Sequence, residues 1–304
     1  MIDKLRNLLE LIRFSHTIFA FPFACLAAIM AISVPLPDGL KLSISLRQVV
    51  GVLLCMVFAR SAAMAFNRLV DHKIDAANPR TQSRHLPRGA VSRIEVWGVL
   101  LVCSLAFVAS TALFLPNRFP LFAAIPVLLF LFGYSLAKRF TAAAHLWLGV
   151  ALSLAPICVW IALRGLVPSA PLTDLLPALI LAVAVATWVA GFDIIYACQD
   201  EAFDRQSGLH SIPALVGVPR ALKFAGWLHG IMWGSLCCLP IVVPQLRLGW
   251  VYVVSLLIIA GLLVYQHRIV RPDDLARVNV AFFNVNAIIS VLLLLATSID
   301  CFLF

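Results

Sequence analysis

Nine apolar runs of membrane-spanning length limit what this chain can fold into. An α-helix needs about 20 apolar residues to cross the hydrocarbon core, and a spanning segment must satisfy its own backbone hydrogen bonds. The sequence is 62% hydrophobic and 12% charged, which is not typical of a soluble domain. It therefore predicts an all-α integral membrane protein, a single domain over residues 1–304 with about nine transmembrane helices. The windows are approximately 14–36, 46–66, 94–115, 119–137, 145–164, 173–195, 221–242, 249–266 and 279–299.

The positive charges orient these spans. Most of the 23 Lys and Arg residues gather at the N-terminus and in the connections on its side of the membrane. Because cytoplasmic loops carry the excess of Lys and Arg, the N-terminus is predicted to be cytoplasmic and the C-terminus to lie outside. The same rule explains the net charge of +9 without a nucleic-acid partner, since the sequence offers no basic domain outside the membrane. Five basic residues lie toward the other side: Lys41, Arg47, Arg118, Arg164 and Arg247.

Neither the first apolar run nor the cysteines indicate processing or metal binding. The first run follows Lys4, Arg6 and Arg13, as in a signal peptide, but it is long and has no convincing cleavage site, so it is interpreted as a retained span. The eight cysteines form no Cys-x-x-Cys pair, and they are interpreted as packed apolar residues.

Two acidic clusters share one spacing, in which a polar anchor precedes aspartates four and eight residues further on. They are Asn67, Asp71, Asp75 and Tyr196, Asp200, Asp204. On a helix, this spacing places all three side chains on one face. Stacked carboxylates repel each other, and a hard divalent cation such as Mg²⁺ resolves the repulsion and bridges to phosphate. A solvated helix end is the alternative for one cluster alone, but the second copy favours the metal site.

The two clusters also suggest an internal repeat. Corresponding aspartates are 129 residues apart, and four spans separate the ends that carry them. An even number of spans keeps the orientation, so both clusters are predicted to face the cytoplasm. Parallel repeats of this kind can build one pseudo-twofold site.

Basic residues near the clusters would complement a diphosphate. Arg68 lies within the first cluster, and Lys138 and Arg139 close the fourth span on the same side. A departing diphosphate needs cations for its developing charge. The positive-inside rule is the alternative explanation, but the connection after Arg139 is so short that this pair is expected at the site.

Asp193 is an ionisable residue one turn deeper in the sixth span than Tyr196. Such residues are functional candidates by default, because they are costly in the membrane. Its partner could be an aromatic substrate, a metal-bound water, or Arg60 or Arg68. Two further features are the segment Arg13-Phe14-Ser15-His16, which could line the same cavity, and Asn279, Asn284 and Asn286, which are expected to form hydrogen bonds between helices.

These motifs resemble those of the UbiA superfamily of intramembrane prenyltransferases along nearly the full chain. The resemblance rests on Asn67-Arg68-x-x-Asp71-x-x-x-Asp75 and on Asp193-x-x-Tyr196-x-x-x-Asp200-x-x-x-Asp204, followed by Gly208, Ser211 and Pro213. The segments Tyr134–Arg139, Arg80–Arg84 and Pro87–Gly89 are also similar to the family's pattern.

The resemblance implies a nine-helix bundle around a central cavity that is open to lipid. By analogy, Asp71, Asp75, Asp200 and Asp204 hold Mg²⁺, and Asn67, Arg68, Lys138 and Arg139 bind the substrate diphosphate. Asp193 and Tyr196 would lie at the reacting end, with Asp193 as the base, and Asp71 and Asp200 are counted as catalytic through the metal.

The implied reaction transfers a polyprenyl group from polyprenyl diphosphate to an aromatic acid at the inner membrane. The segment from Arg13 to Ala20, with the second motif, looks most like 4-hydroxybenzoate polyprenyltransferases of ubiquinone synthesis. A futalosine-derived benzoate of a menaquinone route is an alternative acceptor. A secondary transporter that couples ions through the carboxylates is an alternative of another class, which the position of both clusters at span ends disfavours.

Overall fold

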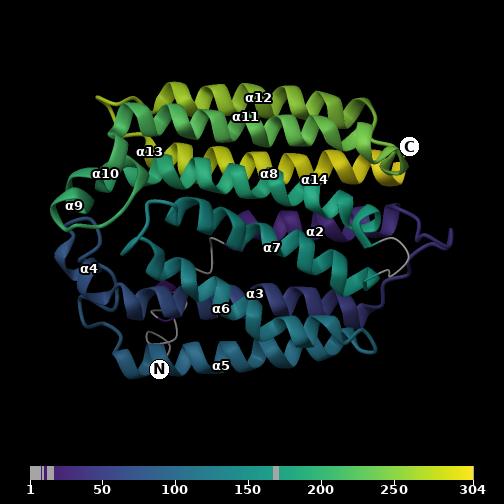
Figure 1. Ribbon diagram of the computed structural model, residues 1–304, viewed down its shortest axis with the longest axis horizontal. Coiled ribbons are helices and arrows are strands. Elements are labelled where there is room, and N and C mark those ends of the chain that lie inside the picture. The colour runs from purple at the N-terminus through teal and green to yellow at the C-terminus, as the bar shows by residue number, and fades with distance from the viewer. Residues whose placement is uncertain (1–7, 9, 12–16, 167–170, 304) are drawn as a thin grey trace. The chain divides into compact units, whose positions relative to one another are not determined.

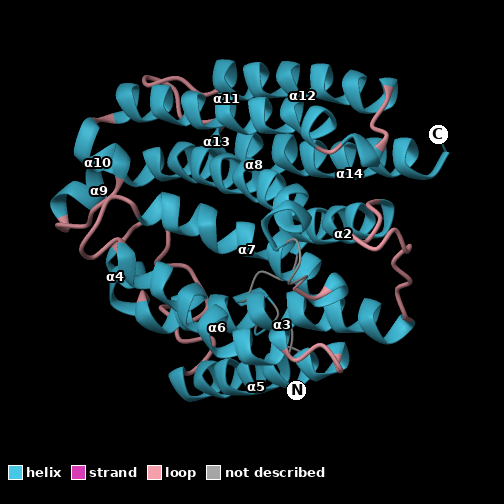
Figure 2. Cartoon of the chain, turned by 45° about the vertical axis from the view of Figure 1, so that its right-hand side comes forward, coloured by secondary structure: helices cyan, strands magenta, loops and turns pink. Residues whose placement is uncertain are grey.

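The described residues of the computed structural model are 8, 10, 11, 17–166 and 171–303, and they form helices joined by loops (Figures 1 and 2). No strand occurs among these residues, apart from one isolated bridge between Arg271 and Asp274. The segment Arg13 to His16 lies outside the described part of the chain. The helices long enough to matter for the membrane are α2 (Thr17–Ser33), α3 (Leu46–Val70), α5 (Arg93–Thr111), α6 (Phe119–Ala137), α7 (Ala144–Arg164), α8 (Pro171–Ala197), α11 (Val218–Val242), α12 (Trp250–Ile269) and α14 (Asn286–Leu303).

These helices confirm the predicted all-α membrane fold. Over the described residues, eight helices are long and apolar enough to cross a membrane, by length and composition. The first predicted span corresponds to α2, whose apolar part Phe21–Ser33 is shorter than the other eight. The last predicted span is one apolar helical stretch, Val278–Leu303, in which α13 (Val278–Val280) and a π-helix (Ala281–Val285) precede α14.

The chain divides into two compact units that interleave in sequence. Unit 1 comprises residues 1–18 and 45–136, and unit 2 comprises residues 19–44 and 137–304. Unit 1 therefore holds α3, α5 and most of α6, whereas unit 2 holds the remaining long helices. The single-domain interpretation stays a prediction.

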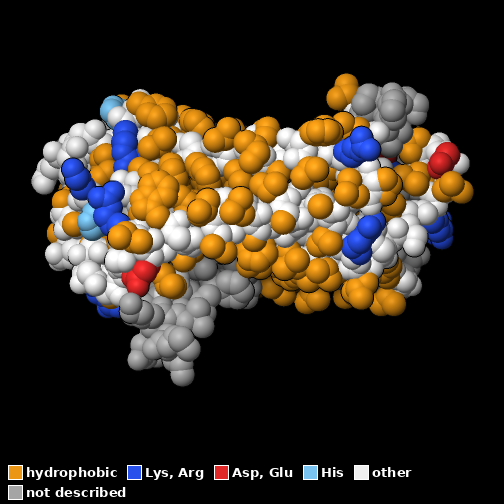
Figure 3. Space-filling view, turned by 90° about the horizontal axis from the view of Figure 1, so that it is seen from below, with side chains coloured by type: hydrophobic (Ala, Val, Ile, Leu, Met, Phe, Trp, Pro, Cys, Tyr) orange, Lys and Arg blue, Asp and Glu red, His pale blue; other side chains and the backbone are white. Residues whose placement is uncertain are grey.

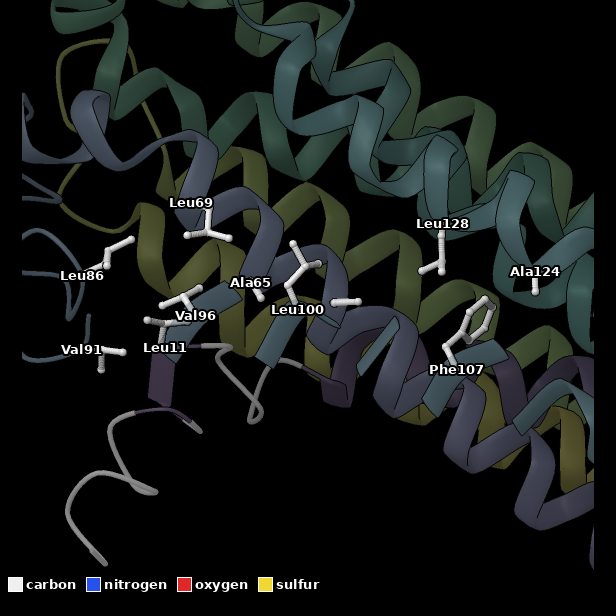
Figure 4. Packing of buried hydrophobic residues seen from close by; sticks show 11 residues of the cluster. Leu11, Ala65, Leu69, Leu86, Val91, Val96, Leu100, Phe107, Ala124 and Leu128 are labelled. Atoms are coloured by element: carbon white, nitrogen blue, oxygen red, sulfur yellow. The ribbon is translucent and has the colours of Figure 1, made fainter. Parts of the chain in front are cut away.

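Unit 1 is organised around one apolar cluster, shown in Figure 4. Ala65 and Leu69 of α3 pack with Leu100 and Phe107 of α5, and the cluster extends to Ala124 and Leu128 of α6. Leu86 and Val91 of the loop after α4 belong to the same cluster, so this loop is part of the packed unit.

Side-chain caps fix where α3 and α5 begin. Ser45 and Gln48 form a reciprocal capping box at the start of α3, and Ser92 and Glu95 form another at the start of α5. Each box satisfies backbone N–H groups that a helix start leaves without partners.

Unit 2 depends on close contact between neighbouring helices, of which α7 with α8 and α8 with α11 are the most extensive pairs. Gly149 of α7 illustrates the closeness: a Cβ placed there would lie 2.2 Å from the Ala186 carbonyl oxygen of α8 and 3.3 Å from the Ala190 Cβ. Small residues at such crossings allow helix backbones to approach, as is common in membrane proteins.

The exposed surface suits a bilayer. Ile94, Leu101, Val102 and Leu105 of α5 are all more than half exposed. On the face shown in Figure 3, hydrophobic side chains cover the middle, and Lys and Arg gather toward the ends. Extended apolar surfaces of this kind mark places where a protein meets a membrane or a partner.

Candidate active site

The first acidic cluster is buried where α3 ends. Asp71 separates α3 from the short helix α4 (His72–Ala77), yet its N–H bonds to the Asn67 carbonyl at 2.9 Å and the Asp75 N–H bonds to the Asp71 carbonyl at 2.7 Å. The predicted helical spacing thus survives the break. The Asn67 amide donates to Asp71 Oδ2 at 3.0 Å, and Asp71 and Asp75 are 3% and 4% exposed.

Asp75 lies between two guanidinium groups. Arg84 Nη1 donates to Asp75 Oδ1 at 2.6 Å, and Arg68 Nη1 lies 3.6 Å from Asp75 Oδ2. The second distance is an ion pair and too long for a hydrogen bond, so Oδ2 is a buried oxygen that accepts no hydrogen bond from the described residues. Thr81 donates to the Asp75 backbone carbonyl at 2.9 Å, which ties the following loop to the same residue.

The second cluster lies on short helices after α8 and is less buried. Asp200 ends a 3₁₀ turn (Cys198–Asp200), Asp204 lies on α9 (Glu201–Gln206), and both are partly exposed. The charges around Asp204 include Asp200 and Lys138, and Ser211 is its hydrogen-bond partner. The His210 N–H also donates to the Lys138 carbonyl at 2.7 Å, which holds the basic segment against this loop.

The residues that follow the second motif shape its loop. Gly208 has φ +66°, a conformation that other residues rarely adopt. Ser211 caps α10 (Ile212–Val216) by accepting the Ala214 N–H, and Pro213 lies in the first turn, where its missing N–H costs nothing.

Asp193 has a partner that the sequence did not reveal. His145 Nδ1, on the first turn of α7, lies 2.7 Å from Asp193 Oδ2 on α8. The signal available was a histidine at the start of an apolar span, six residues after Arg139, but nothing in the sequence links it to Asp193.

An aromatic row leads from Tyr196 along α8. Trp188, Phe192 and Tyr196 are one turn apart, and Phe282 of the π-helix lies against both Phe192 and Tyr196, with ring centroids at 5.2 Å and 4.5 Å. π-Helical segments often mark functional sites. This aromatic contact to Tyr196 was not expected from the sequence.

Asn286 holds that arrangement together. It accepts the Trp188 indole N–H at 3.0 Å and donates to the Phe282 carbonyl at 2.9 Å. The expectation that Asn286 forms a hydrogen bond between helices is therefore confirmed.

The donor chemistry fits Mg²⁺. Each unit supplies a carboxylate pair, Asp71 with Asp75 and Asp200 with Asp204, and Mg²⁺ is typically bound by one or two carboxylates while it keeps several waters. The buried Asp75 Oδ2 without a hydrogen bond is the kind of oxygen that a cation would satisfy. Within the described residues no group of three or more His, Cys, Asp or Glu side chains gathers closely enough to enclose a metal.

The structure thus brings the predicted residues together within each unit. Unit 1 groups Asn67, Arg68, Asp71 and Asp75. Unit 2 groups Asp200, Asp204 and Lys138. Arg139 follows Lys138 directly and is partly buried. The catalytic, diphosphate-binding and metal-binding roles of these residues stay predictions.

Carboxylate pairs beside cations, at the ends of membrane-length helices, suit an enzyme that handles an apolar chain with an anionic diphosphate head. The chain is accordingly a membrane-bound prenyltransferase. Residues 19–288 match the UbiA prenyltransferase family, and the chain belongs to that family. The resemblance found in the motifs is confirmed, and the transporter alternative is set aside.

Curated relatives agree with this assignment. The chain is 32% identical over 235 residues to a 4-hydroxybenzoate octaprenyltransferase of Coxiella burnetii, with 76% of each chain covered. It is 30% identical to the 4-hydroxybenzoate octaprenyltransferase of Aliivibrio fischeri, over 76% of each chain.

Solved structures share the fold. A UbiA homolog from Aeropyrum pernix K1 has a TM-score of 0.81 and 31% identity, covering 95% of this chain and 98% of that one. A UbiA homolog from Archaeoglobus fulgidus bound to GPP and Mg²⁺ has a TM-score of 0.67 and 21% identity, covering 96% and 99%.

Proposed function

We propose that the protein transfers a polyprenyl group from polyprenyl diphosphate to 4-hydroxybenzoate in a Mg²⁺-dependent step of ubiquinone biosynthesis. The observation that carries the proposal is the pair of carboxylate clusters, one of which holds a buried oxygen without a hydrogen bond. The acceptor is taken from the names of the curated relatives. The reaction takes place at the cytoplasmic face of the inner membrane, as the distribution of Lys and Arg favours.

Asp71 and Asp75 of unit 1, and Asp200 and Asp204 of unit 2, are the carboxylates that would hold the metal. Bound Mg²⁺ would neutralise charge on the diphosphate and so make it a better leaving group. Two Mg²⁺-bound structures of a homolog, one with GPP and one with DMAPP, support a divalent cation for the fold.

Cationic and amide side chains bind the diphosphate directly. Arg68, which lies beside Asp75, and Lys138, which acts on Asp204, would counter the charge that grows as the leaving group departs. Arg139 adds a second cation after Lys138. Asn67 orients Asp71 through its amide hydrogen bond and offers its remaining polar capacity to the diphosphate.

Bond breaking and bond making then follow in order. The allylic C–O bond of the prenyl diphosphate breaks, and its electron pair leaves with the diphosphate. A ring carbon of the acceptor donates an electron pair to the allylic cation, which forms the new C–C bond. Asp193 takes the proton from that ring carbon, and the electrons of the broken C–H bond restore the aromatic ring.

Aromatic side chains protect the cation from water. Tyr196, with Phe282 against its ring, lies one turn from Asp193. A ring face attracts a cation electrostatically, and an apolar wall excludes the water that would capture it.

The first experiment is a membrane assay with Mg²⁺ and a labelled polyprenyl diphosphate. It offers 4-hydroxybenzoate and a futalosine-derived benzoate in parallel, with EDTA as the control. A prenylated 4-hydroxybenzoate that EDTA abolishes supports the proposal. Product from the futalosine derivative alone would reassign the acceptor, and no product from either, with folded protein present, would overturn the proposal.

A further inference from the structure

We propose that His145 is a positioning residue that orients Asp193 for removal of the acceptor proton, an inference that rests on the proposed function. His145 belongs to neither of the two motifs. It comes from α7, 48 residues before Asp193, and is joined to it by the 2.7 Å contact between Nδ1 and Oδ2. His145 also lies close enough to Asp204 to act electrostatically on that carboxylate.

The two side chains differ in burial, and this difference indicates which of them can reach the acceptor. The Asp193 side chain is 24% exposed, whereas the His145 side chain is 7% exposed. Asp193 is the member of the pair that reaches accessible space, and His145 lies behind it. Nε2 of His145 is buried and has no hydrogen-bond partner among the described residues, so the contact to Asp193 is the one that orients the ring.

The direction of the hydrogen bond follows from the acceptor. The proposed base must be an ionised carboxylate, which can only accept, so the proposal assigns the proton of His145 to Nδ1, from where it is donated to Asp193 Oδ2. This donation fixes one carboxylate oxygen and leaves Oδ1 to receive the ring proton. A carboxylate that rotated freely would present that oxygen in a productive direction for a smaller share of the time.

The helix crossing holds the imidazole in place. Gly149 lies one turn after His145 on α7, and Ala190 lies three residues before Asp193 on α8. The close approach of Gly149 to Ala186 and Ala190 brings the two backbones together at this level. The short side chain of Asp193 can therefore reach the imidazole ring of His145 directly.

Three substitutions of His145 separate positioning from packing. His145→Asn places an amide N–H where Nδ1 donates, whereas His145→Gln extends the amide toward the position of Nε2. His145→Ala removes both. Each is compared in membranes of the full chain with Mg²⁺, a polyprenyl diphosphate and 4-hydroxybenzoate.

The variants are expected to differ in kcat, while their KM for the polyprenyl diphosphate stays close to that of the wild type. His145→Ala and His145→Gln lower kcat by about 30-fold, in the range expected for a misplaced catalytic group, and leave the KM for the polyprenyl diphosphate within about threefold. His145→Asn retains at least about a third of the wild-type kcat, because it restores the donor. Ser153→Ala, two turns further along the same helix, is the control and should match the wild type, since Ser153 bonds within its own helix.

A double substitution tests whether His145 acts through Asp193. Asp193→Asn alone should lower kcat by about 100-fold, and His145→Ala added to it should cause no further loss beyond about twofold. A full additional 30-fold loss would overturn the inference, as would equal activities of the Asn and Gln variants. Loss of folded protein in all three His145 variants would also overturn it, because the residue would then serve the fold.

The wild type in the same assay separates the two proposals. If it forms no Mg²⁺-dependent product, the proposed function fails and the inference fails with it. If it is active and the variants do not follow the pattern, the inference about His145 alone is wrong.

Discussion

The two acidic clusters share a spacing but differ in their surroundings. In unit 1, Asp71 and Asp75 are almost fully buried, and Asp75 is joined to Arg84 and approached by Arg68. In unit 2, Asp200 and Asp204 are partly exposed on two short helical segments, close to Lys138 and Ser211. The first cluster is therefore part of the packing of its unit, whereas the second lies on short helical segments beyond the end of α8.

The difference indicates that substitutions in two motifs of the same spacing need not affect the stability of the protein equally. Breaking a buried ion pair leaves an uncompensated charge, and that is expensive. A partly exposed carboxylate keeps contact with water in the folded protein, so its neutralisation should change stability less than that of a buried ion pair. Function and stability should therefore be coupled in the first cluster and separable in the second.

The largest expected effect is on turnover. Asp71→Ala or Asp200→Ala should each reduce prenyl transfer by about 100-fold or more, since each removes a predicted metal ligand. The measurement is initial rate in membranes that contain equal amounts of each inserted variant. Full activity in either variant would refute the metal assignment for that cluster and break the functional equivalence of the two.

A smaller effect should separate the clusters by stability. Asp75→Asn should destabilise the protein by about 2 kcal/mol, less than a fully buried pair would suggest because Arg84 is 22% exposed. Asp204→Asn should change stability by no more than about 0.5 kcal/mol. Thermal unfolding of the detergent-solubilised variants measures both, and equal shifts would show that burial does not distinguish the clusters.

Two ion pairs near the clusters allow the same comparison of buried and exposed charges on a smaller scale. Arg84→Gln should increase proteolysis within residues 78–91 by about fivefold, since it weakens the contact that ties this loop to Asp75. Arg205→Gln is the matched control, because Arg205 is 62% exposed and pairs with Glu201 on its own short helix. Equal protection of the loop in the Arg84 variant would mean that Leu86 and Val91 hold it without the ion pair.

The smallest effect is expected from a charge remote from both motifs. Arg118 is exposed just before α6, at the opposite end of that helix from Tyr134. Arg118→Ala should change turnover by less than about twofold, as is usual for a surface position. A large loss would indicate that positive charge in general supports activity, which would weaken the assignments of Lys138 and Arg139.

Hydropathy was sufficient to locate the long helices, because lipid imposes a length and a composition that the sequence displays directly. Both motifs were also visible, since their spacing is local. The break at Asp71 and the π-helix at Ala281–Val285 were not visible in the sequence, because each is a local change in backbone hydrogen bonding. Neither shifts the apolar pattern enough to be detected.

The pairing of His145 with Asp193 lay beyond sequence reasoning for a different reason. It joins residues 48 positions apart and requires the crossing of α7 and α8 to be known. The contact of Phe282 with Tyr196 is similar, since it depends on where a π-helical turn directs one ring. Long-range side-chain pairs are decided by packing, which a single sequence does not show.

Gly149 carries a consequence for how variation in this protein is interpreted. It has no functional group, belongs to no motif and touches no predicted ligand, so a survey of chemically active residues would pass over it. Yet even the addition of one methyl group would place a carbon 2.2 Å from a backbone oxygen of the neighbouring helix. Tolerance to substitution along α7 should therefore follow the distance to the neighbouring backbone more closely than it follows polarity or charge.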